Sequence, residues 1–541
     1  MFPNVKQEIR NGRETKIEKN ISVCIEDSIA DKATEVLSLF LPRCTFIKGD
    51  QDSDILALLC ENVDGSPEGY TLTIKNGKTV IEYCSYLGLR NAFATFSLLV
   101  SEVDGVVLLP DVEIKDSPVL SHRGVMLDVA RGTLPFEQLI DDIILIAKAR
   151  HNILHLHIAD AKGVAVEMNA FPEEYRIPNY YTKAQVAEIV RLAGVLGLEI
   201  IPEIDMPAHS TRLNTIFPDL KCDTDVRPQC LWTICAGEER VYELYRNALH
   251  EMAEMFPASR YLHIGGDELE FSDFEGERRR VCHWNECRKC KKKMQEEGIR
   301  DRQELYYYFI NRINGYVKEC GKQTVMWSDQ IDCTRPAGLS KDILMQFWRV
   351  AALGRGPHDG CSMQGQLDLG YQMINSFYWN TYLDEEHYVN SRNLSSWRWD
   401  EIPEITESVK HQIVGSEICA WEYGNREMFR HYDQSLPSAI VLAGDKFWCG
   451  LKKPYDTDTA VGLTKAVLGA AVPDGFNPFE AIGDILPPRY NEPSYVANVI
   501  CSKGKIQEII DVLSDDALYT KGDKTRAGIY KKCVEYTLDK K

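Results

Sequence analysis

Short apolar runs alternate with amphipathic segments from about residue 119 onward, a pattern typical of consecutive strand–helix units. In the amphipathic segments that contain Phe136, Val186 and Val241, apolar side chains recur at helical spacing. The apolar runs predict eight strands, at residues 125–129, 153–157, 198–204, 261–264, 324–327, 343–347, 373–377 and 413–417. Eight such units predict an α/β fold, a (β/α)8 TIM barrel over residues 119–453, with its active site at the carboxyl ends of the strands.

The sequence also predicts a region on each side of the barrel. Residues 1–118 predict a small α+β domain that contains a hairpin at 70–83. Residues 114–118 predict a linker, because Pro118 restricts the residue before it to an extended conformation. Residues 454–541 predict a C-terminal helical extension.

Polar and aromatic residues follow nearly every predicted barrel strand. In chain order they are Arg131, Asp160, Asp205, His209, Asp267, Glu268, Trp327, Asp329, Trp348, Tyr382, Asp384, Trp421 and Glu422. Because the strands of such a barrel end on one face, these side chains are expected to share one pocket. Tryptophan rings are the usual walls for pyranose rings, so the set favours a carbohydrate site.

The segment 261–268 (YLHIGGDE) joins a predicted strand to two adjacent acids. Along a regular strand, neighbouring side chains point to opposite faces, so Asp267 and Glu268 can serve one pocket only after the strand has ended. Gly265 and Gly266 permit that abrupt end. The segment therefore predicts a pair of carboxyl groups for acid–base chemistry.

Four motifs at the predicted strand ends resemble those of the β-N-acetylhexosaminidases of glycoside hydrolase family 20. They are LDVAR at 127–131, NILHLHIAD at 152–160, IPEIDMPAHS at 201–210 and HIGGDE at 263–268. The resemblance covers about residues 70–450. It implies a retaining exo-acting hydrolase that releases terminal β-linked N-acetylglucosamine or N-acetylgalactosamine, with the substrate's 2-acetamido group as nucleophile and an oxazolinium intermediate.

The same resemblance implies roles for five catalytic residues. Asp267 would orient the acetamido N–H, and Glu268 would act as general acid and then general base. Asp160 and His209 resemble the pair that supports the acid–base residue, and Tyr382 resembles the hydroxyl that holds the acetamido oxygen.

The remaining implied roles are in substrate binding. Arg131 resembles the arginine that binds the 3- and 4-hydroxyls, and Asp384 would reach hydroxyls at the far rim. An aromatic box around the acetamido methyl is implied for Trp327, Trp348 and Trp421, for which core packing is the alternative. Glu422 is the candidate for a further hydroxyl-binding acid, although the family places that acid one position later.

The chain departs from the family pattern at three more positions. Ala161 replaces a second acid after Asp160, and Val164 replaces a tryptophan. Both changes are expected near the mouth of the pocket, where they would alter recognition rather than chemistry. Ala208 replaces a glycine before His209.

The sequence leaves two other functional hypotheses open. The same mechanism could serve a sulfated N-acetylglucosamine or release a disaccharide, with cations from the loops 223–227 and 278–280. A non-catalytic carbohydrate-binding barrel would keep the tryptophans but lose an acid, and both acids are present.

Charge and composition limit the classes of partner that the protein can bind. A formal charge of −19 over 541 residues argues against nucleic acid and anionic membranes. Residues 1–21 lack the apolar core of a secretory signal, and no run of about eighteen apolar residues occurs. We therefore expect a cytoplasmic protein without a cofactor, and a homo-oligomer stays open.

Seventeen cysteines, an odd number, favour reduced thiols over a disulfide framework. One cluster, Cys282, His283, Cys287 and Cys290, has the spacing of part of a zinc site, with Cys222, Cys230 and Cys235 upstream. Because a second C-x-x-C pair is missing, ordinary free thiols are favoured and no metal is assigned. A metal-dependent or redox protein built on this cluster is the remaining alternative.

Overall fold

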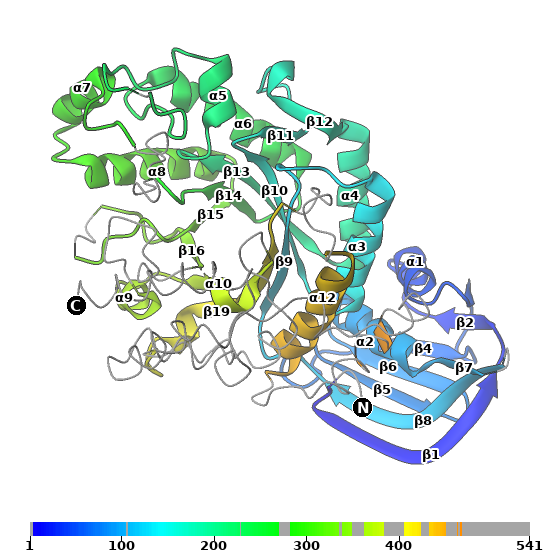
Figure 1. Cartoon of the computed structure of the whole chain (residues 1–541). Helices are drawn as coiled ribbons and strands as arrows, with labels where there is room; N and C mark the ends of the chain where they lie inside the picture. The colour runs from blue at the N-terminus through cyan, green and yellow to red at the C-terminus, as the bar shows by residue number, and fades with distance from the viewer. Residues whose placement is uncertain are drawn as a thin grey trace, which may run out of the picture.

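The computed structural model of the protein describes most of the chain up to residue 450 (Figure 1). The described residues are 4–103, 106–227, 229–269, 282–334, 338–348, 362–383, 405–422, 432–450, 463 and 466–467. Asp384, the basic loop 278–280 and nearly all of the predicted C-terminal extension lie outside them.

Eight parallel strands close into a barrel, as predicted (Figure 1). They are β9 (His122–Asp128), β10 (Ile153–Asp160), β13 (Glu199–Met206), β14 (Tyr261–Gly265), β15 (Gln323–Trp327), β16 (Leu344–Phe347), β17 (Met373–Asn375) and β19 (Ile413–Ala420). Each strand pairs with the next, and β19 pairs back onto β9 with Gly415 opposite His122. All residues of β9 and β10 are buried, because side chains inside and outside a barrel are both covered.

Helices cover the outside of the barrel. The longer ones are α3 (Phe136–Lys148), α4 (Lys183–Leu196), α6 (Glu239–Met255), α7 (Arg288–Glu297), α8 (Arg302–Glu319) and α12 (Tyr432–Cys449). At the start of α4, the Thr182 hydroxyl accepts the Gln185 N–H over 3.3 Å, and the Gln185 side chain accepts the Thr182 N–H over 2.9 Å. Gly197 ends this helix with a φ of 65°.

Shorter elements extend from the barrel strands. The helices are α5 (Thr211–Ile216), α9 (Met363–Asp368), α10 (Tyr378–Thr381) and two 3-10 turns, η1 (Glu173–Tyr175) and η4 (Lys410–Gln412). The strands are β11 (Gly163–Val166), β12 (Arg176–Tyr181) and β18 (Tyr382–Leu383). Because β11 folds back onto β10, the loop after Asp160 is held against the barrel.

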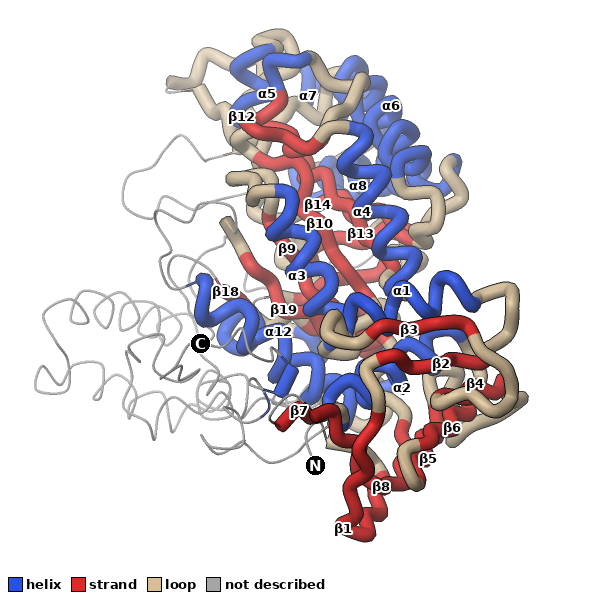
Figure 2. The backbone as a smooth tube through the Cα atoms, turned by 90° about the vertical axis from the view of Figure 1, so that its right-hand side faces the viewer, coloured by secondary structure: helices blue, strands red, loops and turns tan. Residues whose placement is uncertain are grey.

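The N-terminal region forms a mixed sheet with two helices. The strands are β1 (Gln7–Ile17), β2 (Asn20–Cys24), β3 (Thr45–Lys48), β4 (Ile55–Leu59), β5 (Tyr70–Lys75), β6 (Lys78–Tyr83), β7 (Ser101–Val103) and β8 (Val106–Asp116), in the order β1-β8-β5-β6-β4-β2-β3. The helices α1 (Ala30–Phe40) and α2 (Tyr86–Leu99) contact the barrel helices α4 and α3 (Figure 2). The predicted hairpin is β5–β6.

The predicted linker at 114–118 is wrong for its first three residues. They are the end of β8, where Ile114 pairs with Leu72 of β5. Asp116 is buried and accepts hydrogen bonds from the Tyr70 hydroxyl (3.2 Å) and the Trp448 indole N–H (2.8 Å). The restriction imposed by Pro118 is satisfied by a strand as well as by a linker, because both are extended.

Buried charged side chains join the N-terminal region to the barrel. Arg123 on β9 is fully buried and binds both carboxylate oxygens of Glu68, with Nη1 to Oε1 at 3.1 Å and Nη2 to Oε2 at 2.5 Å. Arg90 on α2 donates to the carbonyl oxygens of Ala147 and His151 over 2.5 and 2.6 Å. Such two-pronged contacts fix the orientation of both partners.

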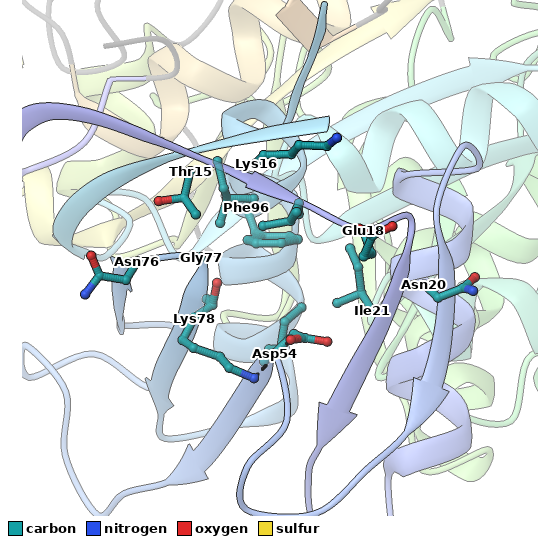
Figure 3. Close-up of a pocket in the computed structure, with 14 residues that line it drawn as sticks. Thr15, Lys16, Glu18, Asn20, Ile21, Asp54, Asn76, Gly77, Lys78 and Phe96 are labelled. Carbon is teal, nitrogen blue, oxygen red and sulfur yellow. Dashed lines mark hydrogen bonds and ion pairs between the residues drawn. The ribbon is translucent and has the colours of Figure 1, made fainter. Parts of the chain in front are cut away.

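Two further features concern surfaces. A pocket of about 280 Å³ lies in the N-terminal region, lined by residues of β1, by Gly77 of the β5–β6 turn and by Phe96 of α2 (Figure 3). It lies apart from the carboxyl ends of the barrel strands. None of the helices in the described part of the chain is both long and apolar enough to cross a membrane.

Candidate active site

Strand β14 ends in a glycine turn that delivers two acids. Gly265 and Gly266 have φ angles of 69° and 100°, which favour glycine. A Cβ atom at position 265 would lie 1.8 Å from Asp205 Oδ1, so the turn leaves no room for a side chain there. Beyond it, Asp267 is buried and Glu268 is partly buried, with a left-handed φ of 51°. Because the turn ends the strand before the two acids, their side chains no longer have to point to opposite faces, as predicted.

His209 lies at the centre of the carboxyl groups that the sequence predicted to meet. It follows β13, and its Nδ1 is 3.1 Å from Asp160 Oδ2. Its Nε2 is 3.5 Å from Asp267 Oδ2, 3.5 Å from Glu268 Oε2 and 3.7 Å from Asp205 Oδ2. One imidazole therefore connects three different strand ends.

The charges of this cluster compensate each other. Burial disfavours a charged imidazole, but the carboxylates around it, those of Asp205 and Asp160 first, hold the pKa of His209 well above its usual value. Burial also disfavours a charged Asp160, but Arg131 and His209 hold the pKa of that carboxyl well below its usual range. At neutral pH an imidazolium therefore pairs with the Asp160 carboxylate and turns its Nε2–H toward the acid pair.

Arg131 joins the first two strand ends. Its Nη1 is 2.8 Å from Asp128 Oδ2, and its Nη2 is 2.8 Å from Asp160 Oδ2. The guanidinium carbon lies 5.0 Å from the centre of the Trp421 ring, within cation–π range. Although burial opposes a charged guanidinium, Asp160 and Asp128 hold the pKa of Arg131 above its usual value. Its side chain keeps 16% of its surface exposed, so part of it can meet a ligand.

Asp160 is also held from inside the barrel. His157 bridges two acids, with Nε2 3.0 Å from Asp160 Oδ2 and Nδ1 2.5 Å from Glu203 Oε2. His155 binds the other side of the same Glu203 oxygen over 3.1 Å and reaches Glu417 Oε2 at 3.0 Å. All of these side chains are buried, so they form a polar layer inside the barrel that holds Asp160 in place.

Aromatic side chains form a cluster beside this polar layer, where Trp421 contacts His157 and Trp327 contacts His155. The rings of Trp348 and Tyr382 stack with 5.7 Å between centroids and an angle of 5°. The ring centroid of Trp421 lies 5.7 Å from those of both Tyr382 and Trp327. Trp327 is only 1% exposed, and its indole N–H donates to Glu203 over 2.7 Å, so it packs as core at the base of the box. The four predicted aromatic residues therefore meet, with different exposures.

The sequence of this barrel matches a known family over most of its length. The profile of the glycosyl hydrolase family 20 catalytic domain covers residues 120–447, more than half of the chain. The chain belongs to glycosyl hydrolase family 20. The match begins just before β9 and ends in α12, so it spans all eight barrel strands.

The individual proteins that this chain resembles in sequence are distant relatives. A β-hexosaminidase of Porphyromonas gingivalis is 29% identical over 442 residues, which are 74% of this chain and 53% of that protein. The β-hexosaminidase subunit alpha of Mus musculus is 25% identical over 374 residues, 66% of each protein. The chain thus spans about half to two thirds of the length of these relatives.

A solved family 20 structure shares the fold. The crystal structure of the exo β-N-acetylglucosaminidase from Vibrio harveyi in complex with N-acetylglucosamine superimposes with a TM-score of 0.72 at 21% sequence identity. The superposition covers 86% of this chain and 76% of that chain.

The positions that depart from the family 20 motifs lie in different surroundings. Ala161 lines a groove of about 870 Å³ that starts at Arg131 and runs past Lys162, as expected for the mouth. Val164 is fully buried in β11 opposite Ala159, at the carboxyl end of β10, so it lies beside the mouth but does not line the groove. The run of apolar and small residues around it belongs to a strand that packs inward.

Glu422 and Ala208 also have defined places in this family 20 barrel. Glu422 has a left-handed φ of 55°, and its N–H donates to Asp128 Oδ2 over 2.8 Å, so its backbone joins the last strand end to the first. Ala208 is fully buried in the turn before His209 and packs with Trp232.

Trp232 is a residue of the site that the sequence did not indicate. Its ring centroid lies 4.1 Å from that of His209, and its indole N–H donates to the Glu268 carbonyl over 2.9 Å. It comes from the long loop between α5 and α6, where no strand end or spacing marks it. Only the return of this loop across the barrel mouth brings it to the acids.

Proposed function

We propose that this chain is a retaining exo-acting β-N-acetylhexosaminidase that hydrolyses terminal β-linked N-acetylglucosamine or N-acetylgalactosamine. The observation that carries the proposal is the placement of Asp267 and Glu268. The two acids leave one glycine turn and lie equally far from His209, at 3.5 Å. Arg131 follows β9, and the aromatic residues lie at the ends of β15, β16 and β19 and in β18, at the same end of the barrel.

Adjacent acids suit a substrate-assisted mechanism. A retaining glycosidase with its own nucleophile needs two carboxyl groups about 5–5.5 Å apart on opposite sides of the scissile bond. When the 2-acetamido group is the nucleophile, the second acid instead belongs beside the first, where it can bind the acetamido N–H. Asp267 Oδ1 is buried and has no hydrogen-bond partner among the described residues, which supports this role.

The proposed reaction has two steps. First, the acetamido carbonyl oxygen bonds to C1 while the bond from C1 to the glycosidic oxygen breaks, and Glu268 gives its proton to the leaving oxygen. This gives an oxazolinium, whose positive charge Asp267 stabilises. Then a water oxygen attacks C1, Glu268 takes the proton of that water, and the ring opens to the β-configured sugar.

The other residues bind and position. Arg131 offers a planar fork of donors for two sugar hydroxyls, and the Tyr382 hydroxyl holds the acetamido oxygen toward C1. Trp348 and Trp421 enclose the acetamido methyl, with Trp327 beneath them. His209, with Asp160 behind it, keeps an N–H toward the acid pair and so stabilises its negative charge.

Release of nitrophenol from β-N-acetylglucosaminide and β-N-acetylgalactosaminide substrates tests the activity. Asp267→Asn and Glu268→Gln are each expected to lower kcat by about 10²–10⁴-fold, the usual effect of losing an acid–base group. Glu243→Gln, on the exposed face of α6, is the matched control and should keep full activity. Full activity in both active-site variants would contradict the proposal.

Substrates with a fluorinated N-acetyl group test the mechanism separately. Fluorine withdraws electrons from the acetamido carbonyl and weakens it as a nucleophile. We expect kcat/KM to fall steadily as one, two and three fluorines are added. A rate that does not respond would point to a nucleophile from the protein and would leave the hydrolase activity itself intact.

A further inference from the structure

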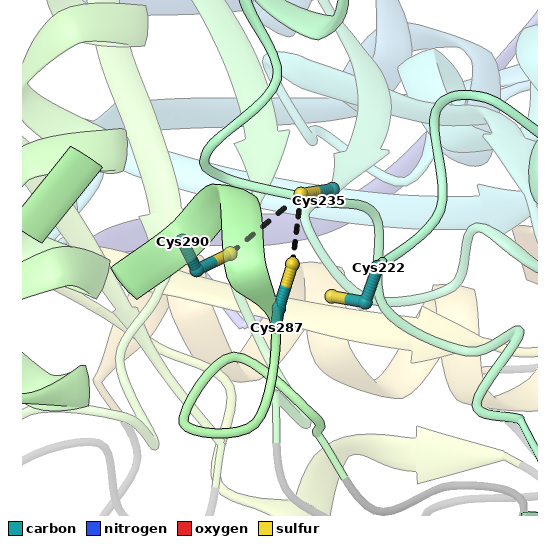
Figure 4. Close-up of side chains that lie close together, drawn as sticks. All are labelled: Cys222, Cys235, Cys287 and Cys290. Atoms are coloured by element: carbon teal, nitrogen blue, oxygen red, sulfur yellow. Dashed lines mark hydrogen bonds between the residues drawn. The ribbon is translucent and has the colours of Figure 1, made fainter. Parts of the chain in front are cut away.

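Four buried cysteines converge beside the active site. Cys222 and Cys235 come from the loop between α5 and α6, and Cys287 and Cys290 come from the start of α7 (Figure 4). Their four sulfur atoms all lie within 4.8 Å of one another. Cys222 is 2% exposed and the other three are fully buried, so the sulfurs face one another in the protein interior.

The sulfur separations fit one tetrahedral metal ion. Cys235 Sγ lies 3.6 Å from both Cys287 Sγ and Cys290 Sγ. Four thiolates at about 2.3 Å from a zinc ion lie about 3.8 Å apart at tetrahedral angles. A disulfide requires about 2.05 Å, and all four cysteines are free thiols. Sulfurs this close also leave no room for a multi-iron cluster between them.

We propose that Cys222, Cys235, Cys287 and Cys290 bind one zinc ion as a closed structural site. Four protein thiolates complete a tetrahedral shell, so the ion has no open position for catalysis. The sequence predicted a different candidate metal cluster, Cys282, His283, Cys287 and Cys290. Only Cys287 and Cys290 of that cluster belong to the proposed site. His283 instead lies 3.5 Å from the Cys230 N–H as an acceptor, and neither it nor Cys282 belongs to the thiol group.

The backbone around the four thiols is built for close approach. A Cβ atom at Gly237 would lie 2.3 Å from the Lys289 carbonyl carbon, so only glycine lets this loop touch the start of α7. The Arg288 N–H donates to the Asp223 carbonyl over 2.9 Å. The Arg288 guanidinium also binds the carboxylates of Asp223 (2.7 Å) and Asp225 (2.9 Å). These contacts join the same two segments that supply the thiols.

The start of α7 stabilises the negative charge of the proposed site. Four thiolates around a doubly charged cation leave a net charge of −2. The Cys287–Cys290 pair lies at the amino end of α7, where the helix dipole stabilises negative charge.

The site would fix the loop that carries Trp232. Trp232 lies between Cys222 and Cys235 in the sequence, and it contacts His209 and Glu268. A metal that binds both ends of this loop to α7 would hold the Trp232 ring over the acid pair. This part of the inference rests on the proposed function, whereas metal binding itself does not.

Metal analysis of the purified full chain tests the site without any activity assay. We expect one zinc per chain. Cys235→Ser and Cys290→Ser should each lower the zinc content at least tenfold, whereas Cys230→Ser and Cys282→Ser, buried cysteines outside the group, should keep one zinc. Chains that hold no zinc, hold iron instead, or lose zinc equally in the control variants would overturn the proposal.

A cobalt experiment needs no variant to fold. Chain produced with Co²⁺ should show intense sulfur-to-cobalt charge-transfer absorption and the visible bands of tetrahedral cobalt, and a mercurial reagent that reacts with the thiols should release the ion. Octahedral cobalt bands, or disulfides among the four cysteines in mass spectra of the native chain, would overturn the proposal. Cobalt bands with no hydrolase activity would retain the metal site and contradict only the proposed function.

Discussion

The Trp232 indole N–H donates to the main-chain carbonyl of Glu268 over 2.9 Å. A loop that begins after α5 therefore holds the backbone of the proposed acid–base residue, which itself follows β14. The same indole ring lies against His209, so one side chain contacts two members of the acid cluster.

Trp232→Phe is expected to lower kcat about tenfold while the protein stays folded. Phenylalanine keeps most of the ring against His209 but loses the hydrogen bond, which contributes about 0.5–1.5 kcal/mol and fixes the Glu268 backbone. Trp448→Phe is the matched control, because the Trp448 indole N–H donates to Asp116 Oδ2 over 2.8 Å, between α12 and the end of β8 and apart from the loop that carries Trp232. It should lower the melting temperature and leave kcat unchanged. Equal losses of kcat in both variants would contradict the role of Trp232.

Asp160→Asn is expected to shift the pH profile. The Asp160 carboxylate is one of the charges that raise the pKa of His209, so its removal lowers that pKa. His209 then loses its proton at a lower pH, and the alkaline limb of kcat/KM against pH should move to lower pH. An alkaline limb in its original position, with only a lower maximum, would show that Asp160 does not set the charge of His209.

Gly265→Ala is expected to abolish activity and lower stability by more than 2 kcal/mol, because the new methyl group meets Asp205 Oδ1 at 1.8 Å. Gly298→Ala isolates the cost of the backbone conformation. Gly298 has nearly the same φ, 66° against 69°, but no atom lies within 4 Å of its added Cβ. It should cost about 1 kcal/mol and leave kcat unchanged. Chemical unfolding and kinetics on both variants separate the cost of the steric clash at position 265 from the cost of the left-handed backbone conformation.

His151→Gln is expected to reduce the acid sensitivity of the fold. Burial lowers the pKa of His151 to about 3, and its Nε2–H donates to the Ile440 carbonyl over 2.8 Å. An unfolded histidine titrates near pH ~6.5, so below that pH only the unfolded chain takes up this proton and stability falls by up to about 1.4 kcal/mol per pH unit. The contribution is complete above pH ~6.5 and lost as the pH falls toward 3.

Urea unfolding at pH 5, pH 8 and pH 9 measures the difference in the free energy of unfolding between the two proteins. Relative to wild type, the glutamine variant should gain about 2 kcal/mol between pH 8 and pH 5. Between pH 8 and pH 9 the difference between the two proteins should stay constant, because neither state changes its protonation at this position. A constant difference down to pH 5 would contradict a buried neutral His151.

The barrel strands could be predicted because parallel strands covered on both faces read as continuous apolar runs. The Thr182–Gln185 capping box is equally local, because its two residues are three positions apart in the sequence. The end of β8 was mistaken for a linker, because what makes it a strand is its pairing with β5, which a single segment does not reveal.

The candidate site likewise contains residues that could be predicted from the sequence and residues that could not. The acids, Arg131 and the aromatic residues directly follow predicted strands, so the barrel rule gathers them. Trp232 and the thiol group depend instead on loops that return over the barrel. Cys235 and Cys287 are 52 residues apart, and no local spacing relates them. The sequence marked the C-x-x-C pair by its spacing and named Cys222 and Cys235 only as upstream cysteines, together with Cys230, which lies outside the group.

The Glu68–Arg123 ion pair limits how this protein can be divided. A gene fragment that starts at residue 119 would encode every barrel strand but would leave the Arg123 guanidinium without its carboxylate at the base of the first one. An unpaired buried charge typically costs several kcal/mol. Chimeric hydrolases that exchange the N-terminal module would therefore need to transfer Glu68 and Arg123 together.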